Sequence, residues 1–419
     1  MNILFYTLGC KVNQAESGGM AALLESRGHT TVSPGERVDA VIINTCTVTA
    51  TADKKARNAI RKMGESYPDA LICVCGCLTQ LSDISEVGRV DVLGGSSGKA
   101  AFALSIEESF ESRRKISVLS DISPGFEALP AAAYDRRTRL FLKIQDGCQC
   151  RCSYCIIPDA RGPCRSCPEE EALRSARDAA DAGCREIVLT GIEISSYTPS
   201  LTGLIKRVCA ELPGVRVRIG SLNPATVTER FCAELAGLGG LCPHFHLSVQ
   251  SGCDGILKAM NRRYTAADMR RAVGLLRSGW ENPAISADII AGFPGETDAQ
   301  WRETLGFLEE TRFSSLHVFP YSRRKGTPAA SFPGQLTAAV KRARAAQAEA
   351  VGRSGRERYL RSRIGDTVEV LFETASDGVW TGHAPQYLQV AVSAEGELRG
   401  KILPVKLTGI RDGLWEGEL

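Results

Sequence analysis

Two series of short apolar segments, each segment followed by a stretch with helical periodicity, run through most of this 419-residue chain. The first series occupies residues 1–120, with predicted strands at Ile3–Thr7, Ala40–Asn44 and Ala70–Val74 and predicted helices at Gln14–Arg27 and Ala52–Met63. Alternation of this kind is typical of parallel sheets covered by helices, since parallel strands need a long crossover. We therefore expect an α/β fold that begins with a parallel-sheet domain.

The second series occupies residues 139–350 and contains about six strand–helix units. The predicted strands are Leu140–Ile144, Glu186–Thr190, Val215–Ser221, His244–Val249, Ala284–Ile290 and Ser315–Pro320. The predicted helices are Glu169–Ala182, Leu201–Leu212, Val227–Leu238, Ala266–Ser278 and Asp298–Thr311. Six units are too few for a closed eight-fold barrel, so they predict an incomplete (β/α) barrel whose site lies at the carboxyl ends of its strands.

The last segment, residues 356–419, has five short strand-like pieces separated by turn residues and predicts a small antiparallel β-barrel. A linker over Ser120–Arg139, which contains Pro124, Gly125 and Pro130, separates the first two segments. The stretch Lys341–Arg363 carries eight basic and two acidic residues. It is either an ordinary solvated helix face or a contact for RNA phosphates.

Three cysteines follow three successive strands of the first segment. Cys10, Cys46 and Cys77 each lie just beyond a predicted strand end. Carboxyl ends of parallel strands share one edge of a sheet, so these thiols are expected to converge into a second metal site. The alternative is that cysteine is simply a common small buried residue. Cys73 and Cys75, which alternate within a strand, are interpreted in that way as core residues.

A second group of cysteines lies in the loop after the first strand of the predicted barrel. Cys148, Cys152 and Cys155 have the spacing Cys-x3-Cys-x2-Cys. Three soft thiolates can bind three irons of a [4Fe–4S] cube and leave one iron open for a ligand. A structural zinc site is disfavoured, because it needs four ligands and no second pair follows at the usual spacing. Cys150 is outside the pattern, and its side chain is expected to point elsewhere.

Composition limits the location of the protein and its partners. Sixteen cysteines without a signal-peptide pattern favour metal ligation in a reducing compartment over disulfides, so a cytoplasmic location is expected. No apolar run approaches the roughly 20 residues that cross a bilayer. A net charge of +3 does not by itself predict nucleic-acid binding, so an RNA site would have to be a local patch.

The cysteine loop resembles that of the radical S-adenosylmethionine (SAM) enzymes, and the whole chain resembles the methylthiotransferases among them. Six segments carry this resemblance. They include Leu8-Gly9-Cys10-Lys11-Val12-Asn13-Gln14, Asn44-Thr45-Cys46, Gly76-Cys77, Pro243–Asp254, Met260-Asn261-Arg262-Arg263-Tyr264 and Asp288–Thr297. The resemblance implies two [4Fe–4S] clusters, one on each cysteine triplet, and SAM bound at the barrel cluster. It also implies that the C-terminal barrel is a TRAM-like RNA-binding domain.

Further residues are candidates for binding SAM. The resemblance places Tyr154 against the adenine and Glu193 at the amino group. Ser221 and Asn223 lie in the segment where the family usually has an acidic residue, which Asn223 replaces. Ser248 and Gln250 alternate on one strand and are expected to face the barrel lumen. Cys164 and Cys167 form a Cys-x2-Cys pair, with Cys167 at a position where the family commonly has arginine, and this pair is interpreted as incidental.

The motifs around Cys10 and at His317–Thr327 are most similar to the branch that acts on tRNA threonylcarbamoyladenosine. The predicted reaction is methylthiolation of C2 of this nucleoside next to the anticodon, with an external flavodoxin or ferredoxin as electron donor. The alternatives are methylthiolation of isopentenyladenosine in tRNA or of a ribosomal-protein aspartate. An alternative of another class is a non-catalytic iron–sulfur electron carrier or an RNA-binding redox sensor.

Overall fold

The computed structural model describes residues 1–130 and 138–419; residues 131–137 of the predicted linker lie outside the described residues. The N-terminal part forms a six-stranded parallel sheet in the order β2-β1-β3-β4-β5-β6. Its strands are β1 (Asn2–Thr7), β2 (Thr30–Thr31), β3 (Ala40–Thr45), β4 (Leu71–Gly76), β5 (Val92–Leu93) and β6 (Ile116–Ser117). The predicted parallel sheet is confirmed; β2, β5 and β6 have two residues each and are too short to show a sequence period.

Helices cover both faces of this sheet, which explains why its central strands are continuously apolar. The helices are α1 (Lys11–Glu25), α2 (Ala50–Ser66), α3 (Cys77–Leu81) and α4 (Lys99–Ser112). On one face, Val41 and Ile43 of β3 pack with Ile60 of α2. On the other, Cys73 and Cys75 of β4 are fully buried in a core shared with α1 and α4, as the sequence predicted.

The central part is an open barrel of parallel strands. The strands are β7 (Arg139–Lys143), β10 (Glu186–Thr190), β11 (Arg216–Ile219), β12 (Ser221–Leu222), β13 (His244–Gln250), β14 (Ala284–Ala291) and β15 (Ser315–Pro320). Gly220 interrupts one long strand to give β11 and β12, and a Cβ there would lie 2.8 Å from the backbone oxygen of Leu189. No pairing joins β7 to β15 within the described residues, so the prediction of an incomplete barrel is confirmed.

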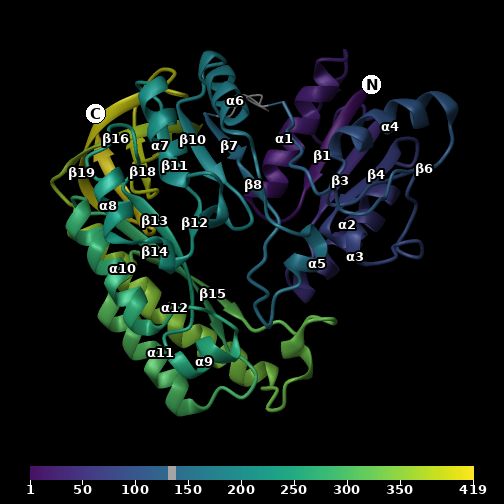
Figure 1. Cartoon of the computed structure of the whole chain (residues 1–419). Helices are drawn as coiled ribbons and strands as arrows, with labels where there is room; N and C mark the ends of the chain where they lie inside the picture. Colours follow the sequence, from purple (N-terminus) through teal and green to yellow (C-terminus); the bar gives the residue numbers. More distant parts are fainter. Residues whose placement is uncertain (131–137) are drawn as a thin grey trace.

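Helices surround this barrel on the outside (Figure 1). They are α6 (Glu169–Asp181), α7 (Leu201–Glu211), α8 (Glu229–Leu235), α9 (Asp254–Ala259), α10 (Ala266–Gly279), α11 (Asp298–Thr311) and α12 (Ala338–Arg361). Thr265 and Thr297 begin α10 and α11 with reciprocal side-chain and backbone hydrogen bonds that satisfy the first turn. Shorter elements in the loops are α5 (Ile157–Arg161), η2 (Ile194–Ser196), η3 (Pro224–Thr226), η4 (Pro328–Ser331), β8 (Gln145–Asp146) and β9 (Arg165–Ser166).

The C-terminal part is a closed five-stranded barrel in the order β16-β17-β18-β20-β19. Its strands are β16 (Thr367–Ser376), β17 (Val379–His383), β18 (Gln389–Ser393), β19 (Ile402–Arg411) and β20 (Leu414–Glu418). The small barrel is therefore confirmed, and it is antiparallel except at the pair β18–β20, which is parallel. Trp415 is fully buried inside it and donates its indole N–H to the backbone oxygen of Leu360 at the end of α12.

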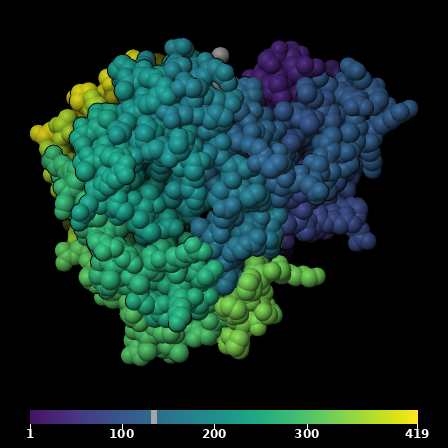
Figure 2. Space-filling model, in the orientation of Figure 1, coloured from purple at the N-terminus to yellow at the C-terminus, as the bar shows by residue number. Residues whose placement is uncertain are grey.

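The C-terminal barrel packs against the amino ends of the central strands. Arg216 and Arg218 at β11 donate to backbone oxygens of residues 383–385, and Arg139 of β7 pairs with Glu373 at 2.7 Å. The N-terminal sheet lies on the other side of the central part (Figures 1 and 2). Within the described residues, none of the helices is both long and apolar enough to cross a bilayer.

The basic stretch predicted at Lys341–Arg363 belongs mostly to α12. Arg344 is buried and pairs with Glu296 at 2.7 Å, while Arg356 donates to the backbone oxygen of Gly413. Lys341 donates to the backbone oxygen of Tyr321. These three cations therefore stabilise packing, so the helix is not a purely solvated face, and the contact with RNA phosphates stays a prediction.

Candidate active site

The first cysteine group lies in the loop after β7 and β8, at the carboxyl edge of the barrel. The loop can turn tightly because Gly147 has φ +72°, and a Cβ there would lie 1.9 Å from the backbone oxygen of Pro163. The Cys148 N–H donates to the backbone oxygen of Gly162, and the Cys155 N–H donates to that of Cys152. These bonds hold the three predicted ligands in one compact loop.

Cys150 does not point elsewhere, contrary to the expectation from the sequence. Its Sγ lies 3.8 Å from the carboxylate of Glu193, and ligand atoms of Cys148, Cys150 and Glu193 all lie within 4.8 Å of one another. The Cys150 backbone N–H donates to the Cys148 sulfur at 3.4 Å, which keeps these two residues close. In the described part of the chain, no other three His, Cys, Asp or Glu ligand atoms lie this close. Ligands of a cube bind separate irons, so a wider spread is expected for them.

Burial disfavours the thiolate form of two of the predicted ligands, Cys152 and Cys155. Burial raises the pKa of Cys155 to about 11 and also raises the pKa of Cys152. Metal binding would displace these protons, because the thiolate is the ligand. The donor set, three adjacent thiols in a loop closed by backbone bonds, fits an iron–sulfur cluster.

The predicted SAM contacts line the same edge of the barrel. The guanidinium of Arg262 donates to the Tyr154 hydroxyl at 2.7 Å, and the Tyr154 ring meets Phe293 edge-on. The Glu193 N–H donates to the side chain of Gln145 at 2.8 Å, and burial raises the Glu193 pKa. A pocket beside them is lined by Gln149, Cys150, Cys152, Asn223, Asn261, Arg262, Arg263 and Tyr264. The sequence predicted no role for Arg262 itself, although the residue lies in the matching motif Met260–Tyr264.

The remaining four predicted SAM contacts have different surroundings. The hydroxyls of Ser221 and Ser248, on neighbouring strands β12 and β13, are 2.8 Å apart. Asn223 accepts from the Ala225 N–H with its side-chain oxygen, so that oxygen already caps η3. The register of β13 against β14 shifts between Leu247 and Gln250, and Gln250 has φ +68°. Simple alternation from Ser248 therefore does not extend to Gln250.

The second cysteine group lies at the carboxyl edge of the N-terminal sheet. Cys10 immediately precedes α1, Cys46 follows β3, and Cys77 is the first residue of α3 after β4. Gly9 has φ +110°, and a Cβ there would lie 2.8 Å from the Cβ of Cys46. Cys46 and Cys77 are buried, whereas Cys10 is exposed at the mouth of the group. The topology thus brings the three thiols together.

Buried side-chain amides form hydrogen bonds with the residues around this second group. The Cys10 thiol donates to the side-chain oxygen of Asn13 at 3.3 Å. The Asn13 amide in turn donates to Asn44 and to the backbone oxygen of Thr45. Thr45 donates its hydroxyl to the backbone oxygen of Cys75. These bonds connect the ends of β3 and β4 to the start of α1 and hold the thiols in register.

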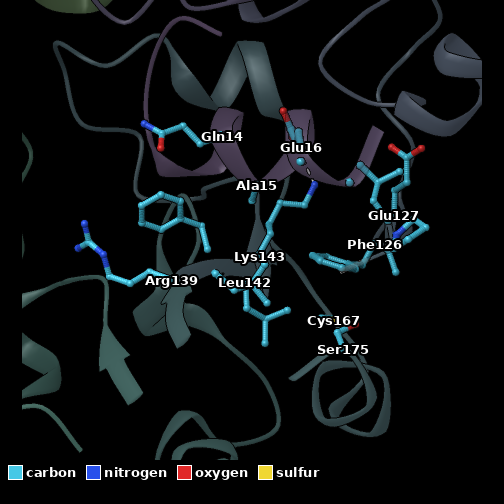
Figure 3. A pocket seen from close by; sticks show the side chains of 17 residues that line it. Gln14, Ala15, Glu16, Phe126, Glu127, Arg139, Leu142, Lys143, Cys167 and Ser175 are labelled. Atoms are coloured by element: carbon cyan, nitrogen blue, oxygen red, sulfur yellow. Dashed lines mark hydrogen bonds and ion pairs between the residues drawn. The ribbon is translucent and has the colours of Figure 1, made fainter. Parts of the chain in front are cut away.

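A buried charge network joins this group to the barrel. Arg161 is fully buried and directs its Nε–H to the Cys77 sulfur at 3.3 Å, while its terminal nitrogens bind Glu16 and Asn13. Lys143 of β7 also reaches Glu16, at 3.3 Å (Figure 3). Burial alone would raise the pKa of Glu16, but Arg161, Lys143 and Lys99 together lower it.

The network has more positive than negative charge. It contains two carboxylates, Glu16 and Asp146, and four cations, Arg161, Lys143, Arg165 and Lys99. Buried charge without a partner is costly, so an anionic group beside Arg161 would be stabilised. Thiolates at Cys77 and its neighbours supply such a charge, and the surroundings therefore fit a thiolate-bound cluster.

One short helix connects the two cysteine groups. α5 begins two residues after Cys155 and ends at Arg161, which contacts Cys77. The Cα atoms of Cys155 and Arg161 are therefore at most about 13 Å apart. Both groups accordingly face the region where the N-terminal sheet meets the carboxyl edge of the barrel.

Comparison with known proteins agrees with this architecture. Residues 142–308 match the radical SAM superfamily, and residues 2–93 match the uncharacterized protein family UPF0004. The fold resembles that of the radical SAM methyltransferase TsrM from Kitasatospora setae, with a TM-score of 0.57, 17% identity and coverage of 78% of this chain and 77% of that one. The molecule is thus built as a radical SAM protein.

Relatives cover nearly the whole chain. It is 35% identical to the threonylcarbamoyladenosine tRNA methylthiotransferase MtaB of Bacillus subtilis, over 97% of this chain and 93% of the relative. It is 33% identical to the tRNA-2-methylthio-N(6)-dimethylallyladenosine synthase of Alkaliphilus oremlandii, over 99% and 91%. The chain belongs to the tRNA methylthiotransferases of the radical SAM superfamily. It is therefore an enzyme of this type that uses a [4Fe–4S] cluster and SAM, which confirms those predictions.

Proposed function

We propose that this enzyme adds a methylthio group to C2 of N6-threonylcarbamoyladenosine next to the anticodon of tRNA. The observation that carries the proposal is the pair of three-thiol groups, which α5 connects across the boundary between the N-terminal sheet and the barrel. Relatives named for this reaction cover nearly the full chain. A reaction that needs both radical formation and sulfur delivery fits two adjacent cluster sites.

The proposed ligands are Cys148, Cys152 and Cys155 for the first cluster. Cys10, Cys46 and Cys77 are the proposed ligands for the second. With both clusters and SAM bound, the cofactors would supply reductive cleavage of SAM, removal of the C2 hydrogen and sulfur for insertion. The external electron donor would be a flavodoxin or ferredoxin.

The protein side chains orient these groups. Arg262 holds the Tyr154 hydroxyl, so the ring is fixed beside the loop where the adenine of SAM would lie. Glu193 is the proposed partner of the SAM amino group, and the Ser221–Ser248 pair offers hydroxyls to its ribose or carboxylate. Asn223 can offer its amide N–H groups and the second lone pair of its oxygen, which already accepts from the Ala225 N–H.

The C-terminal barrel is the proposed RNA-binding part. It packs on the amino ends of the central strands through Arg139, Arg216 and Arg218. Single-stranded loops expose bases that can be splayed out and bound at their edges.

Nucleoside analysis distinguishes the substrate classes. In a strain without this protein, tRNA should lose the methylthio derivative of threonylcarbamoyladenosine, and the chain expressed from a plasmid should restore it. Loss of the isopentenyladenosine derivative instead would favour the second candidate, which is supported by the relatives of that name. A change only in ribosomal-protein mass would overturn the tRNA assignment.

Cofactor analysis tests the second cluster and the non-catalytic alternative. Two [4Fe–4S] clusters predict about eight irons and eight sulfides per chain, and Cys10→Ala should halve both if Cys10 is a ligand. Reduced, reconstituted protein should release 5′-deoxyadenosine from SAM. No release would favour an electron carrier or redox sensor.

A further inference from the structure

The lumen of the open barrel contains a group of imidazoles with one carboxylate. His246 of β13 pairs with Asp288 of β14 at 3.0 Å and contacts the Ser286 hydroxyl at 2.9 Å. The His317 ring of β15 meets His246 with centroids 5.1 Å apart. His244, two residues before His246, contacts the same serine at 3.3 Å. Of these three imidazoles, His246 contacts the carboxylate directly, and the other two lie beside it.

Lys11 approaches this group from the N-terminal part. It is half-buried, begins α1 directly after Cys10, and places its ammonium 5.3 Å from the ring centroid of Tyr387. Among residues 1–130 and 138–419, no carboxylate lies within 4.0 Å of this ammonium. Burial lowers the pKa of His317, the charges of His246 and Lys11 lower it further, and Asp288 opposes them, so the charge of Lys11 is felt at His317.

The other cations around Tyr387 already have partners. Arg218, 4.6 Å from the ring centroid, forms two hydrogen bonds of 2.8 Å with Glu186. Arg139, at 5.4 Å, pairs with Glu373 at 2.7 Å. Of the three cations around the Tyr387 ring, Lys11 is therefore the one without a carboxylate partner among the described residues.

We infer that Lys11, with His317 beside it, binds the carboxylate of the threonyl group on the substrate base and is a specificity-determining residue. This inference rests on the proposed function. A base presented to the thiol of Cys10 would have its N6 substituent within reach of the adjacent lysine. A site that pairs a buried charge discriminates strongly against an analogue without the matching charge, because the charge is then left unpaired. An apolar isopentenyl group would leave the Lys11 ammonium without a carboxylate partner.

The test compares three anticodon stem-loop RNAs with the reconstituted enzyme, SAM and a chemical reductant. The RNAs carry threonylcarbamoyladenosine, its neutral methyl ester, or isopentenyladenosine. The methylthio product is quantified by mass spectrometry to give kcat and KM. We expect the wild type to have a KM for the acid about 10-fold to 100-fold below that for the ester, as for a charged hydrogen bond.

Variants separate recognition from packing. Lys11→Met should raise KM for the acid about 10-fold or more and leave KM for the ester unchanged, whereas Lys11→Arg should retain most of the preference. Lys206→Met, on the exposed face of α7, is the matched control and should change neither value. Equal increases for acid and ester would assign Lys11 a packing role on Tyr387 and overturn the inference.

The wild-type comparison needs no variant and keeps the inference testable if Lys11→Met fails to fold. Wild-type enzyme that modifies the acid and the ester with equal KM would overturn the inference alone. Wild-type enzyme that modifies neither, but releases 5′-deoxyadenosine, would overturn the proposed function. The two failures are therefore distinguishable.

Discussion

Replacing Arg161 by methionine should loosen the N-terminal sheet from the barrel. Methionine keeps the length of the side chain but removes the bonds to Cys77, Asn13 and Glu16. Loss of one partner of a buried charge pair costs about 3–5 kcal/mol. Lys143 at 3.3 Å and Lys99 at 4.0 Å still face Glu16, so we expect the lower end of this range, about 3 kcal/mol.

Urea unfolding of the metal-free protein measures this effect. With a slope of about 2–3 kcal/mol per molar, a loss of about 3 kcal/mol lowers the midpoint of the first transition by roughly 1–1.5 M. Arg174→Met is the matched control, because Arg174 is 65% exposed and pairs only with Glu171 on its own helix. The control should change stability by less than about 0.5 kcal/mol. Equal midpoints for the two variants would refute the role of the buried network.

Three further predictions concern the glycine before Cys77, the acid range and the SAM pocket. Gly76→Ala should destabilise the protein by about 2 kcal/mol or more and reduce the amount of bound iron, because Gly76 has φ +112° and a Cβ there would lie 2.4 Å from a backbone oxygen. The control is Gly64→Ala, in open space within α2, which should lower neither the stability nor the iron content. Burial raises the pKa of Glu186, but Arg218, Arg139 and Arg216 together lower it, so its contribution to stability is complete above the unfolded pKa of about 4.3 and is lost as pH falls below it. Acid titration of Glu186→Gln should therefore show a shallower loss of stability than the wild type, and parallel curves would contradict this. Arg262→Met should raise KM for SAM about 10-fold in the cleavage assay while iron content stays constant, and an unchanged KM would exclude contact through Tyr154.

Local patterns predicted most elements of the fold. Strands such as Glu186–Thr190 and helices such as Asp298–Thr311 have the same bounds in sequence and structure, because strong apolar periods and capping residues lie within each segment. The two-residue strands β5 and β6 escaped prediction, since a period cannot be read from two residues. The parallel pairing of β18 with β20 also depends on barrel closure and not on either strand's own sequence.

The candidate site was predictable where one rule relates sequence to space. The carboxyl ends of parallel strands share one edge of a sheet, which predicted that Cys10, Cys46 and Cys77 converge. The structure places them at that edge. The same rule gave no information on Cys150, whose thiol lies 3.8 Å from the carboxylate of Glu193, 43 residues further along the chain. Asn223 is a predicted SAM contact, and its side-chain oxygen also caps η3, a local bond that the sequence alone did not predict.

The sequence by itself determined the chemistry available to this protein: thiols spaced to hold iron, alternating strands and helices that bring loops to one edge, and a small barrel at the end. Tertiary structure decided how these parts face one another. Glu16 and Arg161 are 145 residues apart, and Lys11 meets Tyr387 across most of the chain. Such contacts depend on how separate layers pack and on which buried charges remain to be neutralised, and no local period records either.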